Sequence, residues 1–383
     1  MTRLAMMLPF DFQPRTRVVF GGGALSRLGE IVRDVGGKRV LIVTDKGIVA
    51  AGHLERARKL LETDGIHVAV FDAVRENPDT EDVSRCVDVA RGFAVDMFVG
   101  LGGGSSMDTA KGANFILTNG GEMRDYHGVG KASKPMLPLV AIPTTAGTGS
   151  ECQSFALIAD PASHLKMACG DPKAAARVAI LDPELTVSQP PRVTACTGVD
   201  ALVHALETAV TKKRTELSRL FSREAFCLII KAFPAVLAKP DDIEARGAML
   251  LGAAYAGMAI ENSMLGCAHS AANPLTAHFG VIHGQAVGRL ITSVMRRNVR
   301  EEFAVNEYDA LAGLVGYSSF EPLIGRIEEI LGLAGLDAPL GKLGVTEESI
   351  GKMAQEASAQ WTASFNPVRY ETSDFEAIYR ELL

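Results

Sequence analysis

Four side chains of types that bind metal ions occur in two parts of the chain. Asp200 and His204 are four residues apart in a segment with helical spacing, so both face one side of it about one turn apart. His269 and His283 lie in residues 262–288, which contain no Asp, Glu, Lys or Arg. One carboxylate and three imidazoles suit Fe(II), Zn(II), Mn(II), Co(II) or Ni(II), and an open position on such an ion could polarise an alcohol or carbonyl oxygen. Separate structural histidines, with a surface pair at positions 200 and 204, are the alternative.

Three further segments have the composition of phosphate- or ribose-binding loops. Residues 102–106 (GGGSS) follow a strand-like segment and precede a helix-like one, which allows backbone N–H groups to approach an anion at a helix N-terminus. They lack the GxGxxG spacing, and a plain glycine-rich turn is the alternative. Asp45 ends a strand-like run, where an acid can accept hydrogen bonds from ribose hydroxyls or simply cap a helix. Residues 142–152 offer several small hydroxyl donors, which suit a ligand or a tight turn.

These residues must be positioned by two regions of different character. Up to about residue 187, strand-like and helix-like segments alternate, which predicts a parallel sheet covered on both faces. The predicted strands are 17–20, 40–44, 68–71, 97–101, 139–142 and 178–181, and the predicted helices are 53–63, 79–90 and 107–117. Beyond Pro190-Pro191 almost all signals are helical, at 200–210, 217–237, 243–264, 284–295, 304–315, 320–331 and 347–359. We therefore expect an α/β domain at 1–187 and an all-helical domain at 188–383.

Composition excludes several other classes of protein. The 383 residues are 47% hydrophobic and 22% charged with a net charge of −6, which disfavours disorder and nucleic-acid binding. The six cysteines form no CxxC pair, so neither a disulfide framework nor a cysteine-rich zinc site is indicated. The charge-free window 262–288 is long enough to span a bilayer, but its three histidines and other polar residues would be costly there. The N-terminus lacks the apolar core of a signal peptide, and we expect a cytoplasmic protein.

The order and spacing of these motifs resemble the iron-containing (group III) alcohol dehydrogenase family along nearly the whole chain. The matching segments are PRTRVVFG at 14–21, LIVTDKG at 41–47, GGGSSMDTAKG at 102–112, AIPTTAGTGSE at 141–151, LDPELT at 181–186, GVDALVHALE at 198–207, His269 with His283-Gly284, and NPVR at 366–369. The resemblance implies an N-terminal dinucleotide-binding domain with a parallel sheet and a C-terminal helical domain that holds the metal.

The resemblance also assigns residues to roles. It implies that Asp200, His204, His269 and His283 are the metal ligands, with Fe(II) expected and Zn(II) as an alternative. The pyrophosphate loop would be Gly103, Gly104, Ser105 and Ser106, and further cofactor contacts would be Asp45, Asn77, Thr144, Thr145 and Lys166. Asp45 is the acid that accompanies NAD rather than NADP in such enzymes. A homodimer is the expected assembly.

The sequence departs from the family pattern at two places. Many relatives carry a second histidine four residues after the third metal ligand, near the nicotinamide, whereas this chain has Asn273, which cannot relay protons. The dipeptide Asn273-Pro274 itself favours a turn. His278 is a candidate substitute for the missing histidine, although a packed or solvent-facing role is the simpler interpretation. The second departure is Cys152-Gln153, where relatives often have Val-Thr. Both changes bear on the proton path and on the substrate.

The sequence therefore predicts a metal-dependent NAD(H) oxidoreductase that interconverts a small alcohol and its aldehyde or ketone. One alternative is a lyase or cyclase of the dehydroquinate synthase type, which uses NAD transiently. That reaction would need several Lys and Arg side chains near the metal, and the charge-free window argues against them. The other alternative is a metal- or nucleotide-binding protein that has lost catalysis, which only Asn273 and Gln153 suggest.

Overall fold

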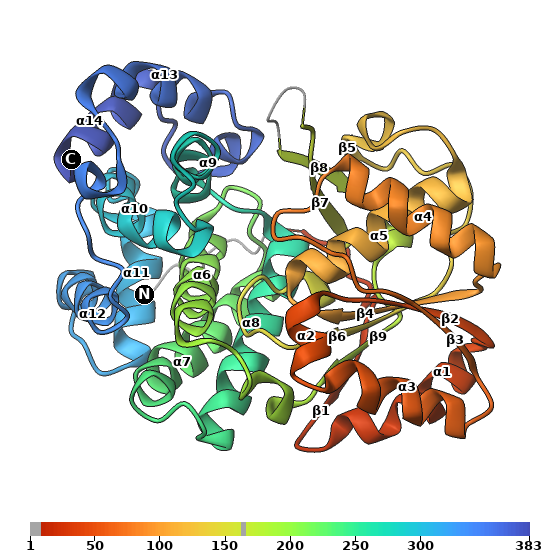
Figure 1. Ribbon diagram of the computed structural model, residues 1–383. Helices are drawn as coiled ribbons and strands as arrows, with labels where there is room; N and C mark the ends of the chain where they lie inside the picture. The colour runs from red at the N-terminus through yellow and green to blue at the C-terminus, as the bar shows by residue number, and fades with distance from the viewer. Residues whose placement is uncertain (1–8, 162–165) are drawn as a thin grey trace. The chain divides into compact units, whose positions relative to one another are not determined.

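The computed structural model describes residues 9–161 and 166–383 of the chain. The chain divides into two compact units (Figure 1). Residues 13–189 form an α/β unit, and residues 190–383 form a helical unit to which residues 9–12 also belong. The sequence prediction had assigned residues 9–12 to the first domain.

The α/β unit is built on a six-stranded parallel sheet with strand order β1-β9-β6-β4-β2-β3. The strands are β1 (Arg17–Phe20), β2 (Arg39–Val43), β3 (His67–Phe71), β4 (Met97–Gly102), β6 (Leu139–Pro143) and β9 (Val178–Leu181). The central strands β4 and β6 are buried along their whole length. Such strands are covered on both faces, which explains why their sequences are continuously apolar instead of alternating.

Helices cover both faces of this sheet, as the sequence predicted. The helices are α1 (Leu28–Val35), α2 (Lys46–Ala50), α3 (His53–Thr63), α4 (Thr80–Phe93) and α5 (Gly104–Asn119). Val40 and Ile42 of β2 pack into one core with residues of α1 and α3, whereas Leu41 and Val43 pack into a second core with residues of α4 and α5. Alternate side chains of one strand thus enter opposite cores, and Figure 1 shows the two pairs of helices on opposite sides of the sheet.

A small second sheet was not predicted. Its strands β5 (Gly128–Val129), β7 (Phe155–Ala159) and β8 (Lys166–Gly170) follow the order β5-β8-β7, with β7 and β8 antiparallel. The sequence of β8, KMACG, contains no β-branched or aromatic residue, so it carries little strand propensity. Pairing with β7 makes it a strand, and this pairing is a tertiary contact that local sequence does not reveal.

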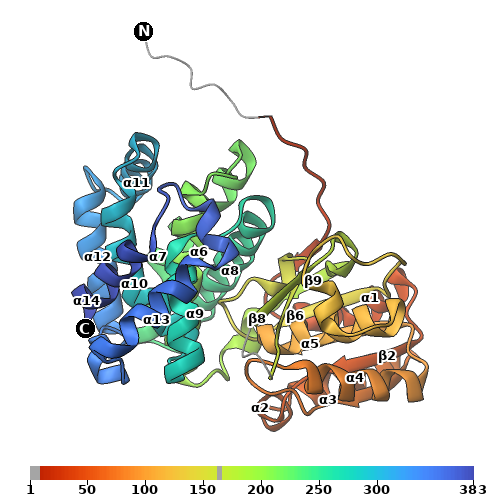
Figure 2. The same cartoon turned by 90° about the horizontal axis from the view of Figure 1, so that it is seen from above.

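The helical unit contains no strand within the part of the chain that the structure describes. Its helices are α6 (Pro191–Val210), α7 (Glu216–Ala238), α8 (Ile243–Ser263), α9 (Cys267–Phe279), α10 (His283–Asn298), α11 (Glu302–Leu314), α12 (Phe320–Leu333), α13 (Glu347–Ser358) and α14 (Thr372–Leu382). Helix α6 is buried along nearly all of its length and packs against α7, α8 and α10. Helix α13 packs against α9 and α14 (Figure 2).

Helix α9 differs from the sequence prediction. The dipeptide Asn273-Pro274 favours a turn, but both residues lie inside α9. Proline removes one backbone hydrogen bond from a helix interior and is normally destabilising there. The buried face of α9, which includes Cys267, Ala271 and Leu275 at 0% exposure, supplies tertiary packing that outweighs this local preference.

The charge-free window 262–288 is not one continuous helix. It runs from the end of α8 through all of α9 into the start of α10. None of the described helices is both long and apolar enough to cross a membrane.

Candidate metal centre and cofactor loops

Three helices of the helical unit carry the four side chains predicted to bind a metal. Asp200 and His204 lie one turn apart on α6, His269 is in the first turn of α9, and His283 is the first residue of α10. Gly284 allows α10 to approach α6 closely, because a Cβ atom at this position would lie 1.9 Å from the carbonyl oxygen of Cys196. The close contact of these two backbones brings His283 to the same place as the α6 residues.

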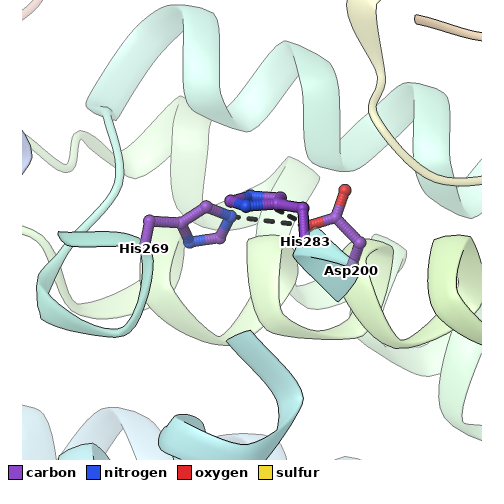
Figure 3. Close-up of side chains that lie close together, drawn as sticks. All are labelled: Asp200, His269 and His283. Carbon is purple, nitrogen blue, oxygen red and sulfur yellow. Dashed lines mark ion pairs between the residues drawn. The ribbon is translucent and has the colours of Figure 1, made fainter. Parts of the chain in front are cut away.

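The Asp200 carboxylate is the centre of the cluster. Its Oδ1 atom lies 3.4 Å from His204 Nε2, 3.5 Å from His269 Nε2 and 3.8 Å from His283 Nε2. Ligand atoms of Asp200, His269 and His283 all lie within 4.8 Å of one another (Figure 3). The ring of His204 stacks on that of His269 with centroids 4.8 Å apart. The structure therefore brings the four predicted metal-binding residues together.

The electrostatics of the cluster oppose the effect of burial. Burial alone would raise the pKa of Asp200, but the facing imidazoles, His204 foremost, hold that pKa below the usual value of an aspartate. Burial also disfavours a charged imidazole, yet the nearby Asp200 and Glu207 carboxylates raise the pKa of His269 to about 9. Both shifts show that the cluster favours positive charge next to Asp200 Oδ1.

The donor set fits a divalent cation. Asp200 and His269 are each only 5% exposed, and within the described residues neither Asp200 Oδ1 nor His269 Nε2 makes a hydrogen bond. Buried polar atoms are nearly always paired, so two such atoms that face each other point to a ligand between them. A carboxylate oxygen and imidazole nitrogens are the ligands preferred by borderline ions such as Fe(II) and Zn(II).

Sequence reasoning missed one residue of this region, Glu207. Its carboxylate lies 2.6 Å from Nδ1 of His269, on the side of the ring opposite Nε2. The available signal was spacing, because positions 200, 204 and 207 lie on one face of an α-helix. Glu207 stands within the GVDALVHALE motif, but no role was assigned to it.

The two candidates for a proton relay have different surroundings. Asn273 lies four residues after His269, hence on the same face of α9, and its Nδ2 donates to Gln360 Oε1 at 3.0 Å. His278 lies nine residues after His269 and therefore on the opposite face of the helix. Its Nε2 pairs with Glu356 Oε2 at 2.6 Å. His278 therefore does not join the cluster around Asp200 in the part of the chain that the structure describes.

The glycine-rich segment forms the start of α5 in the α/β unit. Gly103 is the N-cap, and Gly104, Ser105 and Ser106 are the first helical residues. Gly102 has φ +145°, a conformation that side chains rarely allow, and a Cβ at Gly104 would lie 2.8 Å from Thr148. Ser106 Oγ is buried and has no hydrogen-bond partner among the described residues. Helix N-termini favour anions, so this hydroxyl and the first turn of α5 have the chemistry of a candidate pyrophosphate site.

The carboxyl ends of β2, β4 and β6 bring other predicted cofactor residues beside this loop. Asp45 caps α2, since its Oδ1 accepts from the N–H groups of Gly47 and Ile48 at 2.8 and 3.1 Å. Its Oδ2 lies 3.4 Å from the point where a Cβ of Gly102 would stand. Asp45 thus serves as a helix cap and still places one oxygen beside the glycine loop.

Thr144 and Thr145 approach the glycine loop from the neighbouring strand β6. The N–H of Thr144 donates to the carbonyl of Gly102 at 2.9 Å, and Thr145 Cγ2 lies 3.4 Å from the Cβ position of Gly103. The last two predicted cofactor residues meet each other, with Lys166 Nζ 3.4 Å from Asn77 Oδ1. The structure therefore brings Asp45, Thr144 and Thr145 to the glycine loop, and it brings Asn77 and Lys166 to each other.

A buried polar network supports the loop that follows β6. Lys111 Nζ donates to the carbonyl and the hydroxyl of Ser150 at 2.6 and 2.8 Å, and the same hydroxyl donates to Asp108 Oδ1 at 2.7 Å. Glu151 is 1% exposed, and burial raises its pKa to about 7. The network ties the loop to α5, so the two segments that would contact a cofactor are held together.

Comparisons with known proteins agree with this description. The family model of iron-containing alcohol dehydrogenases matches residues 14–183, and the model of the C-terminal region of the Fe-containing alcohol dehydrogenase family matches residues 194–383. The NAD-dependent methanol dehydrogenase of Bacillus methanolicus is 36% identical over 371 residues, which cover 95% of this chain and 97% of the relative.

Solved structures show the same similarity. A 1,3-propanediol oxidoreductase superimposes with a TM-score of 0.94 and 31% identity, covering 98% of this chain and 100% of that chain. A sulfoacetaldehyde reductase from Bifidobacterium kashiwanohense, solved in complex with NAD+, gives a TM-score of 0.90 and 29% identity, covering 98% of this chain and 99% of the other. The predicted fold class, an α/β region with a parallel sheet followed by a helical region, is confirmed.

Proposed function

The chain belongs to the iron-containing alcohol dehydrogenase family, and from this premise we propose that it is an NAD(H)-dependent oxidoreductase that interconverts a small alcohol and its aldehyde or ketone. The observation that carries the proposal is the convergence of three imidazoles on Asp200 Oδ1 in a buried site. The relatives support the reaction class, since their names specify oxidation of methanol, oxidoreduction of 1,3-propanediol and reduction of sulfoacetaldehyde.

Asp200, His204, His269 and His283 would hold a divalent ion, which supplies Lewis acidity toward an alcohol or carbonyl oxygen. Fe(II) is the expected ion, with Zn(II) as the alternative, because this donor set accepts both. The chain's own contribution is to fix its ligand atoms before the ion binds. Asp200 supplies the negative charge, and burial among helices keeps bulk water away from its carboxylate.

In the α/β unit, the start of α5 and Ser106 Oγ would bind the pyrophosphate of the dinucleotide, whose nicotinamide supplies the hydride chemistry. Asp45 Oδ2 would accept hydrogen bonds from ribose hydroxyls, and its charge would repel a 2′-phosphate. This arrangement favours NAD over NADP. Thr144, Thr145, Asn77 and Lys166 would contact other parts of the cofactor.

The test is a substrate screen with the purified protein. NAD, a panel of small primary and secondary alcohols and either Fe(II) or Zn(II) are supplied, and the absorbance of NADH is followed. NADH formation with at least one alcohol, abolished by a chelator and restored by the ion, supports the proposal. Tight binding of NAD and metal without turnover of any alcohol or aldehyde in either direction would contradict it. The homodimeric state and the cytoplasmic location stay predictions.

A further inference from the structure

Helix α9 begins with acceptors supplied by other segments. Its N-cap residue is Gly266, which has no side chain to bond the free N–H groups of the first turn. Glu207 of α6 accepts from the N–H groups of Gly266 and Ala268 at 3.0 and 2.6 Å, and Asn366 Oδ1 accepts from Cys267 at 3.2 Å. The negative charge of Glu207 also lies at the positive end of the helix dipole.

Only glycine at position 266 leaves room for this arrangement. A Cβ there would lie 2.8 Å from Asn366 Oδ1 and 3.0 Å from Glu207 Oε1. Both distances are shorter than ordinary contacts, so the two acceptors are packed directly against the start of α9. Glu207 is itself only 2% exposed, so its position is determined by the protein around it.

The same carboxylate bonds the imidazole of His269. Glu207 Oε2 lies 2.6 Å from His269 Nδ1, and each of the two Glu207 oxygens also accepts a backbone N–H. A carboxylate that accepts at both oxygens calls for a donor at the imidazole, so the proton of the ring is on Nδ1. In the neutral ring that metal binding requires, Nε2 then carries the lone pair and faces Asp200 Oδ1, at 3.5 Å.

We propose that Glu207 is the positioning residue of the metal centre: it fixes the ring of His269 with Nδ1 protonated and Nε2 available as a ligand, and in the same contacts it fixes the helix that carries the ring. The inference rests on the metal site proposed above. Because Glu207 follows Asp200 and His204 on one face of α6, a single helix supplies two ligands and the residue that orients a third. Carboxylates that bond the outer nitrogen of a ligating histidine generally strengthen metal binding.

The test compares metal binding by the full-length wild type and Glu207→Gln. Glutamine keeps the size of the side chain, but an NH₂ group replaces one of its two acceptor oxygens. The remaining oxygen cannot accept from all three groups that bond Glu207, which are the N–H groups of Gly266 and Ala268 and Nδ1 of His269. If its NH₂ group faces Nδ1, the imidazole proton must move to Nε2, which faces Asp200. The dissociation constant for Zn(II), measured by competition with a chromophoric chelator, should rise about 10- to 100-fold.

The matched control is Glu307→Gln, the same change at a buried glutamate of the helical unit that pairs with Arg219 and Arg223. It should lower the melting temperature of the metal-free protein but leave the dissociation constant for Zn(II) within about twofold of wild type. A Glu207→Gln protein that binds Zn(II) as tightly as wild type would overturn the inference. Failure of the wild type itself to bind Zn(II) would instead contradict the proposed function.

A second measurement is made on the wild type and does not depend on the folding of Glu207→Gln. In the zinc-loaded wild type labelled with ¹⁵N-histidine, the two ring nitrogens of His269 are distinguished by NMR, with His269→Gln used only to assign the signal. The inference requires a proton on Nδ1 and the metal-shifted resonance on Nε2. A protonated Nε2 would refute it.

Discussion

Replacing Gly284 by alanine should push α10 away from α6 and weaken the candidate metal centre. In the structure, a Cβ at position 284 would lie 1.9 Å from the carbonyl oxygen of Cys196 and 2.6 Å from its carbon. These are backbone atoms of a buried helix, so no side-chain rotation relieves the clash. Restoring an ordinary contact of about 3.4 Å requires the two helices to separate by about 1.5 Å at this point.

The cost should be seen in both stability and metal affinity. Overpacking of a protein interior typically costs about 1–3 kcal/mol, and the contact with backbone places Gly284→Ala at the upper end of that range. Metal–ligand distances tolerate changes of only about 0.2 Å, whereas His283 would move with α10 by several times as much. We therefore expect denaturant unfolding of the metal-free protein to show the loss of stability, and chelator competition to show at least about a tenfold weaker site.

Gly325→Ala is the matched control. Gly325 is an exposed glycine within α12, and a Cβ there meets no atom within 4 Å. Alanine is the better helix former, so this variant should gain about 0.5–1 kcal/mol with no change in metal affinity. If Gly284→Ala were as stable as the wild type and bound Zn(II) equally well, the close α6–α10 contact could not be what positions His283.

Three further outcomes are expected. Burial raises the pKa of Glu151 to about 7 against the facing charge of Lys111, so the native state holds this proton more tightly than the unfolded state. The contribution of this proton to the free energy of unfolding is full below about pH 4.5 and is lost by about pH 7, a decrease of about 3 kcal/mol. Unfolding measured as a function of pH should show this decrease for the wild type but not for Glu151→Gln. Asp45→Ala removes the cap of α2 and should cost about 1 kcal/mol in unfolding free energy, and titration calorimetry should show weaker binding of NAD. His278→Ala should leave turnover unchanged between pH 6 and 9, because this side chain pairs with Glu356; a profile that changes shape would make His278 the proton relay.

Much of the fold could be predicted from local pattern. The strand at 178–181 and the helix at 53–63 were predicted with the bounds that the structure shows, because the first is a continuous apolar run and the second has strong helical spacing. The turn preference of Asn273-Pro274 does not hold in the structure, since a dipeptide preference ignores the buried face of α9. The second sheet was missed because its strand β8 lacks β-branched and aromatic residues and depends on pairing with β7.

The candidate site shows the same limit. Side-chain chemistry made Asp200, His204, His269 and His283 candidates, and the family resemblance assigned them as ligands; the structure brings them together. Nothing local connected Glu207 with Gly266, the N-cap of α9, which follows 59 residues later in the chain. That contact exists because the fold brings the first turn of α9 to Glu207 of α6, so it could be found only from the tertiary structure. Residue types indicated the candidate metal ligands, whereas Glu207, which would orient one of them, could be recognised only from the packing of the chain.

The most direct test of the central claim is the metal content of the purified protein and of His269→Ala, each loaded with Fe(II) or Zn(II) and passed through a desalting column. We predict one tightly held ion per chain in the wild type, together with chelator-sensitive oxidation of a small alcohol by NAD. His269→Ala should retain its fold but neither the ion nor the activity. An unchanged metal content in His269→Ala would show that the ion binds elsewhere and would contradict the account.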